Sequence, residues 1–351
     1  MNWTLGAKLP CLVPNAFAAH QRVWLCQLAL ALTQTAFVLG SVYLKASLES
    51  VNVKKDGNFS PIVFAFAREV SAGPMLYALS FYTTGTAKPA KPDTWRVVGL
   101  GCCLFCSQLF YILGIELSGV VVATCIQPTI PVFTVLLGIM LQMESAHFRK
   151  LAGIGLAVIG AVSMVFGGAT AHKGIATAAD NSKMLFGNVF LLINTLAMAI
   201  YYVLAKSLVS KYTPLQISAW AYIVGAALMG CTAFVFTPAH DWHIPNVMLL
   251  PLAYWIFICS IGGYYIVNWA MRHLPASQVA AFQCLQPFLG AVLAFSLLHE
   301  QLNWWDLGAF GVVLGLLMIS TDTRDVQFSD VIVKLRGMVS GNTKKLELQT
   351  A

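Results

Sequence analysis

Long apolar stretches alternate with short polar connections along most of this chain of 351 residues. Each stretch is close to the length of a membrane-crossing helix, which needs about 20 mainly apolar residues. We expect such helices at about 23–48, 61–82, 97–116, 119–141, 150–168, 185–206, 214–236, 249–271, 276–298 and 303–321. The pattern therefore predicts an all-α membrane protein with about ten transmembrane helices.

A short motif occurs twice at equivalent places in this apolar pattern. Cys-Ile-Gln-Pro at 125–128 is matched 159 residues later by Cys-Leu-Gln-Pro at 284–287. An acidic residue, Glu144 or Glu300, follows each copy, and a Gly-rich apolar stretch follows each acid. We infer two repeats of five helices each. Because five is odd, the second repeat enters the membrane inverted relative to the first, an arrangement typical of secondary transporters.

The longer polar segments set the expected boundaries of the repeats. We divide the chain into a leader at 1–22, a first five-helix repeat at 23–168, a linker at 169–184, a second five-helix repeat at 185–321 and a tail at 322–351. Lysine and arginine predict the orientation, because they are enriched in cytoplasmic loops. With the N-terminus inside, fifteen of them fall on the inner side and five on the outer side.

This bias predicts an integral, multi-pass protein with both termini in the cytoplasm, in the plasma membrane or an endomembrane. Asn58 begins a glycosylation sequon on the expected outer side, and the sequence leaves its use open.

Composition agrees with a lipid bilayer as the surroundings. Charged residues make up 10% of the chain, against roughly a quarter in soluble domains. The net charge of +7 is scattered over loops and tail, without the basic stripe of a nucleic-acid-binding protein. Most of the nine cysteines lie within apolar stretches, so no disulfide framework is indicated. We expect a small-molecule substrate and no nucleic acid, and we leave a homodimer open.

Catalytic signatures are missing from the sequence. Its histidines fall in loops or at the edges of the apolar stretches, whereas membrane enzymes usually need a buried His, paired acids or a Ser–base couple. No phosphate-binding Gly-x-x-x-x-Gly-Lys-Ser/Thr loop occurs. We therefore expect no enzyme, no cofactor and no metal. Two alternatives to a carrier stay open, namely a lipid-modifying enzyme embedded in the membrane and a non-transporting scaffold or receptor.

Arg68 and Glu69 are the one ionisable pair deep within an apolar stretch. An arginine at the bilayer centre costs about 2.5–3.5 kcal/mol on insertion scales, so such residues usually face a cavity or a partner. Arg68 could attract an anionic substrate group, and Glu69 could carry a coupling proton. The alternative is a fixed polar tie between helices. Neighbours on a helix do not face each other, so we expect separate partners for the two.

Amides and aromatic residues within the stretches form a second group of candidates. Amides both donate and accept hydrogen bonds, which suits polar organic ligands, and aromatic rings can grip an apolar part. The substrate-binding candidates, together with Arg68, are Gln108, Tyr111, Gln127, Asn194, Trp220, Tyr264, Asn268, Gln283 and Gln286. The alternative for any single amide is a hydrogen bond between helices.

Prolines mark the same place in both repeats. Pro128 and Pro131 interrupt the fourth predicted helix, and Pro287 interrupts the ninth. Each removes a helical hydrogen bond, and broken helices at symmetric positions point to a transport site. A kink that only serves packing is the alternative. Small residues at 153, 157 and 161, and at 311 and 315, suit close helix–helix contact.

Taken in order, these features resemble the EamA type of the drug/metabolite transporter superfamily, over about residues 22–321. The matching features are Arg68 with Ala72, the prolines, the two acids and the Gly-rich stretches. The plant WAT1-related branch is the nearest subgroup. The resemblance implies a ten-helix carrier of small organic metabolites, and among these we favour amino acids or related organic acids.

Overall fold

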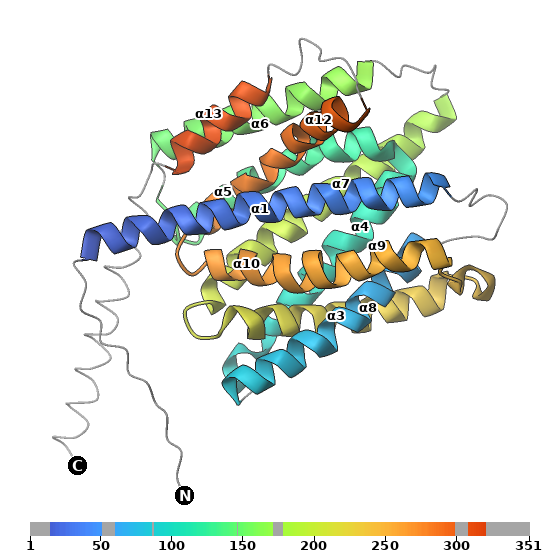
Figure 1. Ribbon diagram of the computed structural model, residues 1–351, viewed down its shortest axis with the longest axis horizontal. Coiled ribbons are helices and arrows are strands. Elements are labelled where there is room, and N and C mark those ends of the chain that lie inside the picture. Colours follow the sequence, from blue (N-terminus) through green and yellow to red (C-terminus); the bar gives the residue numbers. More distant parts are fainter. Residues whose placement is uncertain are drawn as a thin grey trace, which may run out of the picture.

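The computed structural model describes residues 15–50, 60–85, 88–145, 147–170, 178–298 and 308–320, and Figure 1 shows that they form a helical bundle. Within these ranges no strand occurs. Asn58 and Glu300 lie outside the described residues. The longer helices are α1 (Asn15–Ser50), α3 (Pro61–Thr84), α4 (Thr94–Ile126), α5 (Ile130–Met140), α6 (Phe148–Thr170), α7 (Ala178–Leu208), α8 (Pro214–Phe236), α12 (Leu285–Leu298) and α13 (Gly308–Ser320).

Shorter helical pieces complete the chain between α8 and α12. They are the 3₁₀ turns η3 (Ala239–Trp242) and η4 (Asn246–Met248), α9 (Leu249–Tyr254), the π-helix η5 (Trp255–Gly263), α10 (Tyr264–Ala270), α11 (Ala276–Ala281) and the 3₁₀ turn η6 (Phe282–Cys284). Two further 3₁₀ turns are η1 (Lys91–Asp93) and η2 (Gln127–Thr129).

Six helical segments among the described residues are long and apolar enough to cross a membrane. They cover Gln21–Leu44, Pro61–Thr84, Lys91–Ser118, Lys183–Leu208, Pro214–Phe236 and Asn246–Ala270. The prediction of an all-helical, multi-pass membrane protein is confirmed at this level. The other four predicted spans fall on α5, α6, α11–α12 and α13, so the full count of ten stays a prediction.

The predicted break between the third and fourth spans differs from the structure. Helix α4 continues without interruption from Thr94 to Ile126. Asn194 nevertheless contacts both Ser107 in the middle of α4 and Gln127 just after it. Its side-chain amide donates to Ser107 Oγ at 2.9 Å and accepts from Gln127 at 2.9 Å. A straight helix would separate positions 107 and 127 by about 30 Å. The chain therefore reverses direction within the helical run, where the sequence has no polar loop.

Local signals explain where several helices begin and end. Pro61 and Pro214 lie at the first turns of α3 and α8, where a missing backbone N–H costs nothing. Thr213 and Gln216 form a capping box at the start of α8. Helix α3 ends at Gly85, whose φ of 69° is left-handed and therefore favours glycine.

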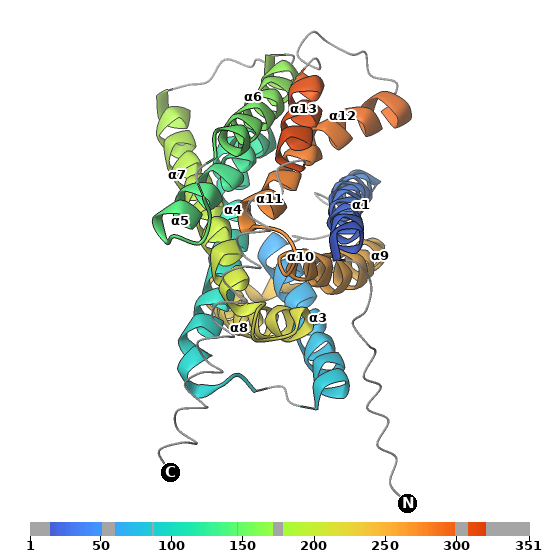
Figure 2. The same ribbon diagram turned by 90° about the vertical axis from the view of Figure 1, so that its left-hand side faces the viewer.

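The bundle consists of two groups of helices that each combine both halves of the chain. Helix α7 packs along α4, η2 and α5, and we call these four the α7 unit. Helix α1 packs against η5, α10, η6 and α12, and we call these five the α1 unit. Figure 2 shows α4, α5 and α7 on one side and α1 with α10 on the other, with α11 between them. Helix α11 follows α10 and precedes η6 in the chain, and it contacts α5 and α7, so it connects the two units.

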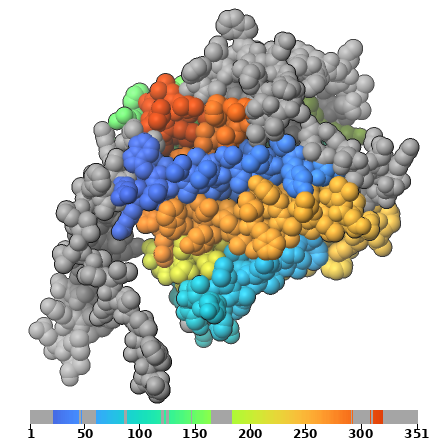
Figure 3. Space-filling model, in the orientation of Figure 1, coloured from blue at the N-terminus to red at the C-terminus, as the bar shows by residue number. Residues whose placement is uncertain are grey.

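Two further helix pairs join the halves. Helix α3 packs on α8, and α6 packs on α13. The predicted close contact of small residues is confirmed in the second pair, where a Cβ at Gly315 would lie 2.5 Å from the backbone of Ala157. Figure 3 shows α1, the α9–α10 region and α3 side by side on one face. On α1, Trp24, Leu28 and Leu32 are more than half exposed, as expected for side chains that face lipid.

The helix breaks predicted from proline lie where the units meet. Turns η2 and η6 contact each other. Gln127 begins η2 and Gln283 lies within η6, and each is four residues before a proline, Pro131 or Pro287. A proline cannot donate to the carbonyl four residues back. Both helices are therefore broken one turn before that proline, and Pro128 adds a second interruption within η2.

Candidate functional site

Arg68 lies between the two units in the centre of the bundle. Its guanidinium donates a hydrogen bond to the side-chain oxygen of Gln108 on α4. On the other side it lies over the ring of Trp255 of η5, 5.5 Å from the ring centroid. The side chain is 14% exposed. An aromatic face attracts a cation, so Arg68 is held by one neutral partner from each unit.

Glu69 is the buried acid next to it. Its side chain is fully buried, and Oε1 lies 3.6 Å from the Arg68 guanidinium. The expectation of separate partners holds for Arg68, which contacts Gln108 and Trp255, but not for Glu69, whose charged partner is the neighbouring Arg68 itself. Among the described residues neither Glu69 oxygen accepts a hydrogen bond. Gly225 of α8 is close by, since a Cβ there would lie 3.2 Å from Oε2.

Four tyrosines form a cluster through edge-to-face ring contacts, and two of them, Tyr222 and Tyr264, interact electrostatically with Arg68 and Glu69. Tyr264 contacts Tyr222 at 5.3 Å and Tyr201 at 6.0 Å between ring centroids, and Tyr201 contacts Tyr202 at 6.0 Å. Tyr201, Tyr202 and Tyr222 are at most 1% exposed. Such edge-to-face pairs stabilise packing beyond the area they bury. The site therefore has rigid aromatic walls.

Two of the predicted amides donate to these tyrosines. Asn268 donates to the Tyr201 hydroxyl at 3.1 Å and to Ser218 Oγ at 2.8 Å. Gln283 of η6 donates to the Tyr202 hydroxyl at 2.7 Å. Asn268 belongs to α10 and Gln283 to η6, whereas Tyr201 and Tyr202 belong to α7. Both amides therefore connect the α1 unit to the α7 unit.

Two amide pairs flank the junction of the broken helices. Gln127 donates to Asn194 at 2.9 Å, and Gln286 donates to Gln34 at 2.8 Å. Gln286 follows Gln127 by 159 residues, and Asn194 follows Gln34 by 160. The same bond therefore occurs once in each unit, between a broken helix and the first helix of the opposite half.

Several polar atoms in the centre are left without a hydrogen-bond partner among the described residues. They are Arg68 Nε, both oxygens of Glu69, Gln108 Nε2, Asn268 Oδ1 and Gln283 Oε1. Buried polar groups nearly always have partners. This set offers two donors and four acceptor atoms, so it could bind a molecule that carries both an anionic and a donor group.

The structure separates other candidates from this group. Trp220 packs against Tyr212 at 4.9 Å between ring centroids, near one end of the bundle. Tyr111 is half-buried on α4, outside the ring contacts of the tyrosine cluster. Sequence reasoning missed Gln34, Tyr201, Tyr202, Tyr222 and Trp255. The internal repeat carried a signal for Gln34, which precedes Asn194 by one repeat length.

Comparison with known proteins identifies the family. The model of the EamA-like transporter family matches residues 46–166 and again 185–321, so two repeats are present. The chain belongs to the EamA-like transporter family. It is therefore a membrane transporter, and the resemblance inferred from the sequence is confirmed.

Individual relatives agree with the family. An uncharacterised transporter of Archaeoglobus fulgidus is 25% identical over 295 residues, which are 83% of this chain and 96% of that protein. The uncharacterised transporter YyaM of Bacillus subtilis is 23% identical over 75% of this chain and 86% of its own. A WAT1-related protein of Arabidopsis thaliana is 25% identical over 60% of this chain and 59% of its own.

A solved structure supports the fold. One crystal structure superposes with a TM-score of 0.67 at 16% identity, covering 87% of this chain and 99% of that chain. At this identity the likeness concerns the fold alone. The names of the relatives indicate transporters rather than enzymes.

Proposed function

We propose that this EamA-family protein carries small organic metabolites, with amino acids or related organic acids favoured, by alternating access between the α7 unit and the α1 unit. The observation that supports this most is Arg68. It is a mostly buried guanidinium between the units with one hydrogen bond to a neutral amide and one free donor atom. A guanidinium in a low-dielectric site binds a carboxylate strongly, because two donors fit two oxygens.

The acceptor groups suit the other end of such a substrate. Both Glu69 oxygens, Asn268 Oδ1 and Gln283 Oε1 can accept hydrogen bonds from an ammonium or hydroxyl group. The tyrosine cluster provides an apolar wall beside them. The substrate-binding set is therefore Arg68, Gln108, Tyr264, Asn268 and Gln283, with Tyr201 and Tyr202 added.

Inverted repeats, with both termini in the cytoplasm, would give the two access states related geometry. The exchange of α1 and α7 between the halves supports this arrangement. Glu69 would carry a proton if transport is proton-coupled, since it is the buried acid that faces the proposed substrate. Transport along a gradient without coupling is the simpler form of the same proposal.

Uptake into proteoliposomes tests the proposal directly. A radiolabelled amino-acid and organic-acid panel would be compared for the wild type, Arg68→Ala, Arg68→Lys and Gln283→Ala. Arg22→Gln is the matched control, because Arg22 is an exposed arginine on α1. We expect saturable uptake that both alanine variants reduce at least about tenfold, since one lost charged pair changes affinity by that order. Arg68→Lys should retain part of the uptake.

The outcomes separate the alternatives. Saturable uptake that is unchanged in Arg68→Ala would place the substrate elsewhere. Absence of uptake across a broad panel, with folded protein, would favour the scaffold or receptor alternative. A dependence of uptake on a pH gradient that disappears in Glu69→Gln would support proton coupling.

A further inference from the structure

Charged side chains tie the α7 unit to the chain around α10 and α11 at one end of the bundle. Lys206 of α7 donates to the backbone carbonyls of Met271 and Leu274, at 2.7 and 2.9 Å. In return, Arg272 donates to the carbonyls of Val209 and Tyr212, both at 3.1 Å. Lys206 thus binds carbonyls just after the C-terminus of α10, and Arg272 binds carbonyls just after the C-terminus of α7. The C-terminus is the end of a helix that favours positive charge.

A carboxylate adds a third tie at the same end. Glu144, which follows α5, accepts the backbone N–H of Ser277 at 3.1 Å and also the Ser277 hydroxyl. Lys150 forms an ion pair with this carboxylate, and both side chains are at most 3% exposed. Ser277 follows Arg272 by five residues. The three ties are therefore adjacent, and we call them the end clasp: Lys206, Arg272 and Glu144 with Ser277.

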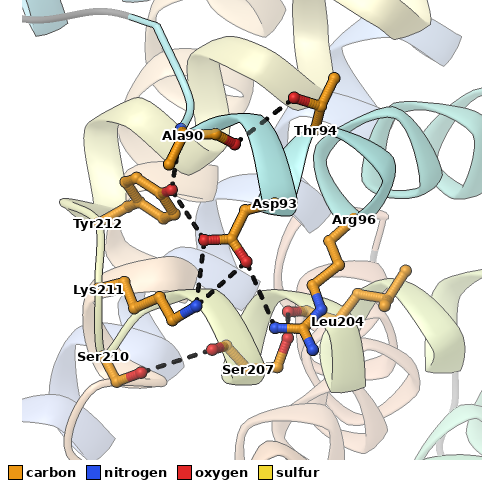
Figure 4. Close-up of polar contacts among 9 residues, drawn as sticks. All are labelled: Ala90, Asp93, Thr94, Arg96, Leu204, Ser207, Ser210, Lys211 and Tyr212. Atoms are coloured by element: carbon orange, nitrogen blue, oxygen red, sulfur yellow. Dashed lines mark hydrogen bonds and ion pairs between the residues drawn. The ribbon is translucent and has the colours of Figure 1, made fainter.

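Asp93 positions one partner of the clasp, as Figure 4 shows. Its carboxylate accepts hydrogen bonds from Lys211 at 3.1 Å and from the Tyr212 hydroxyl at 2.9 Å. The Tyr212 hydroxyl also accepts from the backbone N–H of Ala90 at 3.1 Å. The backbone carbonyl of the same Tyr212 accepts the hydrogen bond from Arg272. Asp93 thus fixes the loop after α7 in the position in which Arg272 reaches it.

The hydrogen bonds at the opposite end differ in kind. There Ser118 donates to the carbonyl of Met184, which joins α4 to α7 within the α7 unit. Closer to Arg68, Trp255 donates to the carbonyl of Gly40 and the neighbouring Tyr254 donates to that of Ala36, so that both bind α1. These neutral bonds hold each unit together, whereas the bonds of the end clasp cross between units.

We propose that the end clasp is a gate that holds one face of the transporter closed, so that the structure represents the state open to the opposite face. The inference rests on alternating access as proposed above, but its test needs no substrate. Charge-assisted hydrogen bonds in a buried site are stronger than neutral ones. To open this face, the transporter must break all three ties and separate α11 from α5.

Cys284 reports on the gate in the natural sequence. It is fully buried in η6, in an apolar cluster that includes Val135 of α5 and Ala281 of α11, so separating α11 from α5 would expose it. Modification of Cys284 by a membrane-impermeant maleimide would be quantified by peptide mass spectrometry in membrane vesicles of both orientations. A Lys88→Cys marker in the loop before α4 identifies which vesicles expose the clasp face.

Ser277→Ala/Arg272→Gln removes the Arg272 tie and the hydroxyl bond of the Glu144 tie, and it keeps the backbone N–H bond of residue 277 and the buried Glu144–Lys150 pair. We expect about tenfold faster modification of Cys284 from the clasp face, since a shift of this order follows from losing a few hydrogen bonds in a two-state equilibrium. From the opposite face the rate should stay unchanged or fall. Lys206→Met, tested separately, should act in the same direction.

Arg149→Gln is the matched control. Arg149 is an exposed arginine on α6 at the same end, next to Lys150 in the sequence, and it belongs neither to the clasp nor to the contacts of Asp93. It should leave Cys284 modification unchanged. The gate is refuted if both clasp variants behave like Arg149→Gln, or if modification rises equally from both faces, which indicates general loosening. If the double variant fails to fold, Lys206→Met and Ser277→Ala alone decide between these results. Substrate uptake plays no part, so failure of the gate and failure of the proposed substrate site are distinguishable.

Discussion

Two glycines of helix α6, Gly155 and Gly160, provide a sharp test of the packing between α6 and α13. A Cβ at Gly160 would lie 2.4 Å from the carbonyl oxygen of Gly308 and 2.6 Å from the backbone nitrogen of Val312. Both neighbours are backbone atoms, so they cannot rotate away. At Gly155, five residues earlier on α6, nothing lies within 4 Å of the added atom. Gly160→Ala and Gly155→Ala therefore make the same chemical change in opposite surroundings.

The expected magnitudes follow from these distances. An ordinary contact begins at 3.4 Å, so Gly160→Ala forces α6 and α13 apart by about 1 Å. A gap of that size loses a quarter to a half of the dispersion attraction across the interface, and overpacking typically costs about 1–3 kcal/mol. Against this, alanine is favoured over glycine within a helix by about 1 kcal/mol. We expect Gly160→Ala to destabilise by up to about 2 kcal/mol and Gly155→Ala to stabilise by up to about 1 kcal/mol.

The assay is unfolding of the purified protein in mixed micelles by increasing SDS, followed by circular dichroism. The two variants should differ by about 1–3 kcal/mol in the free energy of unfolding, because both gain the helix propensity of alanine and only Gly160→Ala incurs the cost of overpacking. Equal stabilities for Gly160→Ala and Gly155→Ala would refute the close approach of the two helices. A loss in both variants would instead show that α6 tolerates no side chain at either position.

Two further predictions concern polar contacts. A double-mutant cycle with Gln127→Leu and Asn194→Leu should give a coupling of about 0.6 kcal/mol in the unfolding assay, typical of hydrogen bonds within membranes; zero coupling would mean that the bond contributes nothing. Asp93 accepts hydrogen bonds from Lys211 and from the Tyr212 hydroxyl, and so holds the loop whose carbonyl Arg272 reaches. Asp93→Asn removes the charge that these bonds depend on. At neutral pH, Cys284 modification from the clasp face should therefore be faster in Asp93→Asn than in the wild type, and an unchanged rate would mean that Asp93 does not support the clasp.

Hydrophobic pattern alone was sufficient for the fold class, because the bilayer requires long apolar helices whatever the function. The sequence predicts that one helix ends near residue 116 and the next begins near residue 119, whereas in the structure the backbone stays helical through this turn. No polar loop marks that turn in the sequence, apart from Glu116 and Ser118. Turns of this kind depend on contacts with a neighbouring helix, here α7, which no local pattern contains.

The candidate site could be predicted only in part for a similar reason. Arg68 and Glu69 stand out because a charge in an apolar stretch is rare and costly. No sequence signal marks Tyr201, Tyr202 and Tyr222, because tyrosine is common in apolar cores. They form a cluster with Tyr264 only because α7, α8 and α10 meet in the folded protein. Trp220 has the same residue type as Trp255, but it lies at the end of the bundle beside Tyr212.

The placement of the amides separates those that hold the fold from those that can change during transport. Gln127 with Asn194 and Gln286 with Gln34 each lie within one unit, and a buried amide without a partner is costly in a membrane. These pairs can stay intact while the units move. Gln283, by contrast, donates to Tyr202 of the other unit, and its acceptor atom Oε1 has no hydrogen-bond donor among the described residues. A motion of the units must break this bond, and a substrate between them can replace it. The symmetric pairs are therefore suited to keep each unit rigid, and the asymmetric amide at the junction is suited to sense the substrate.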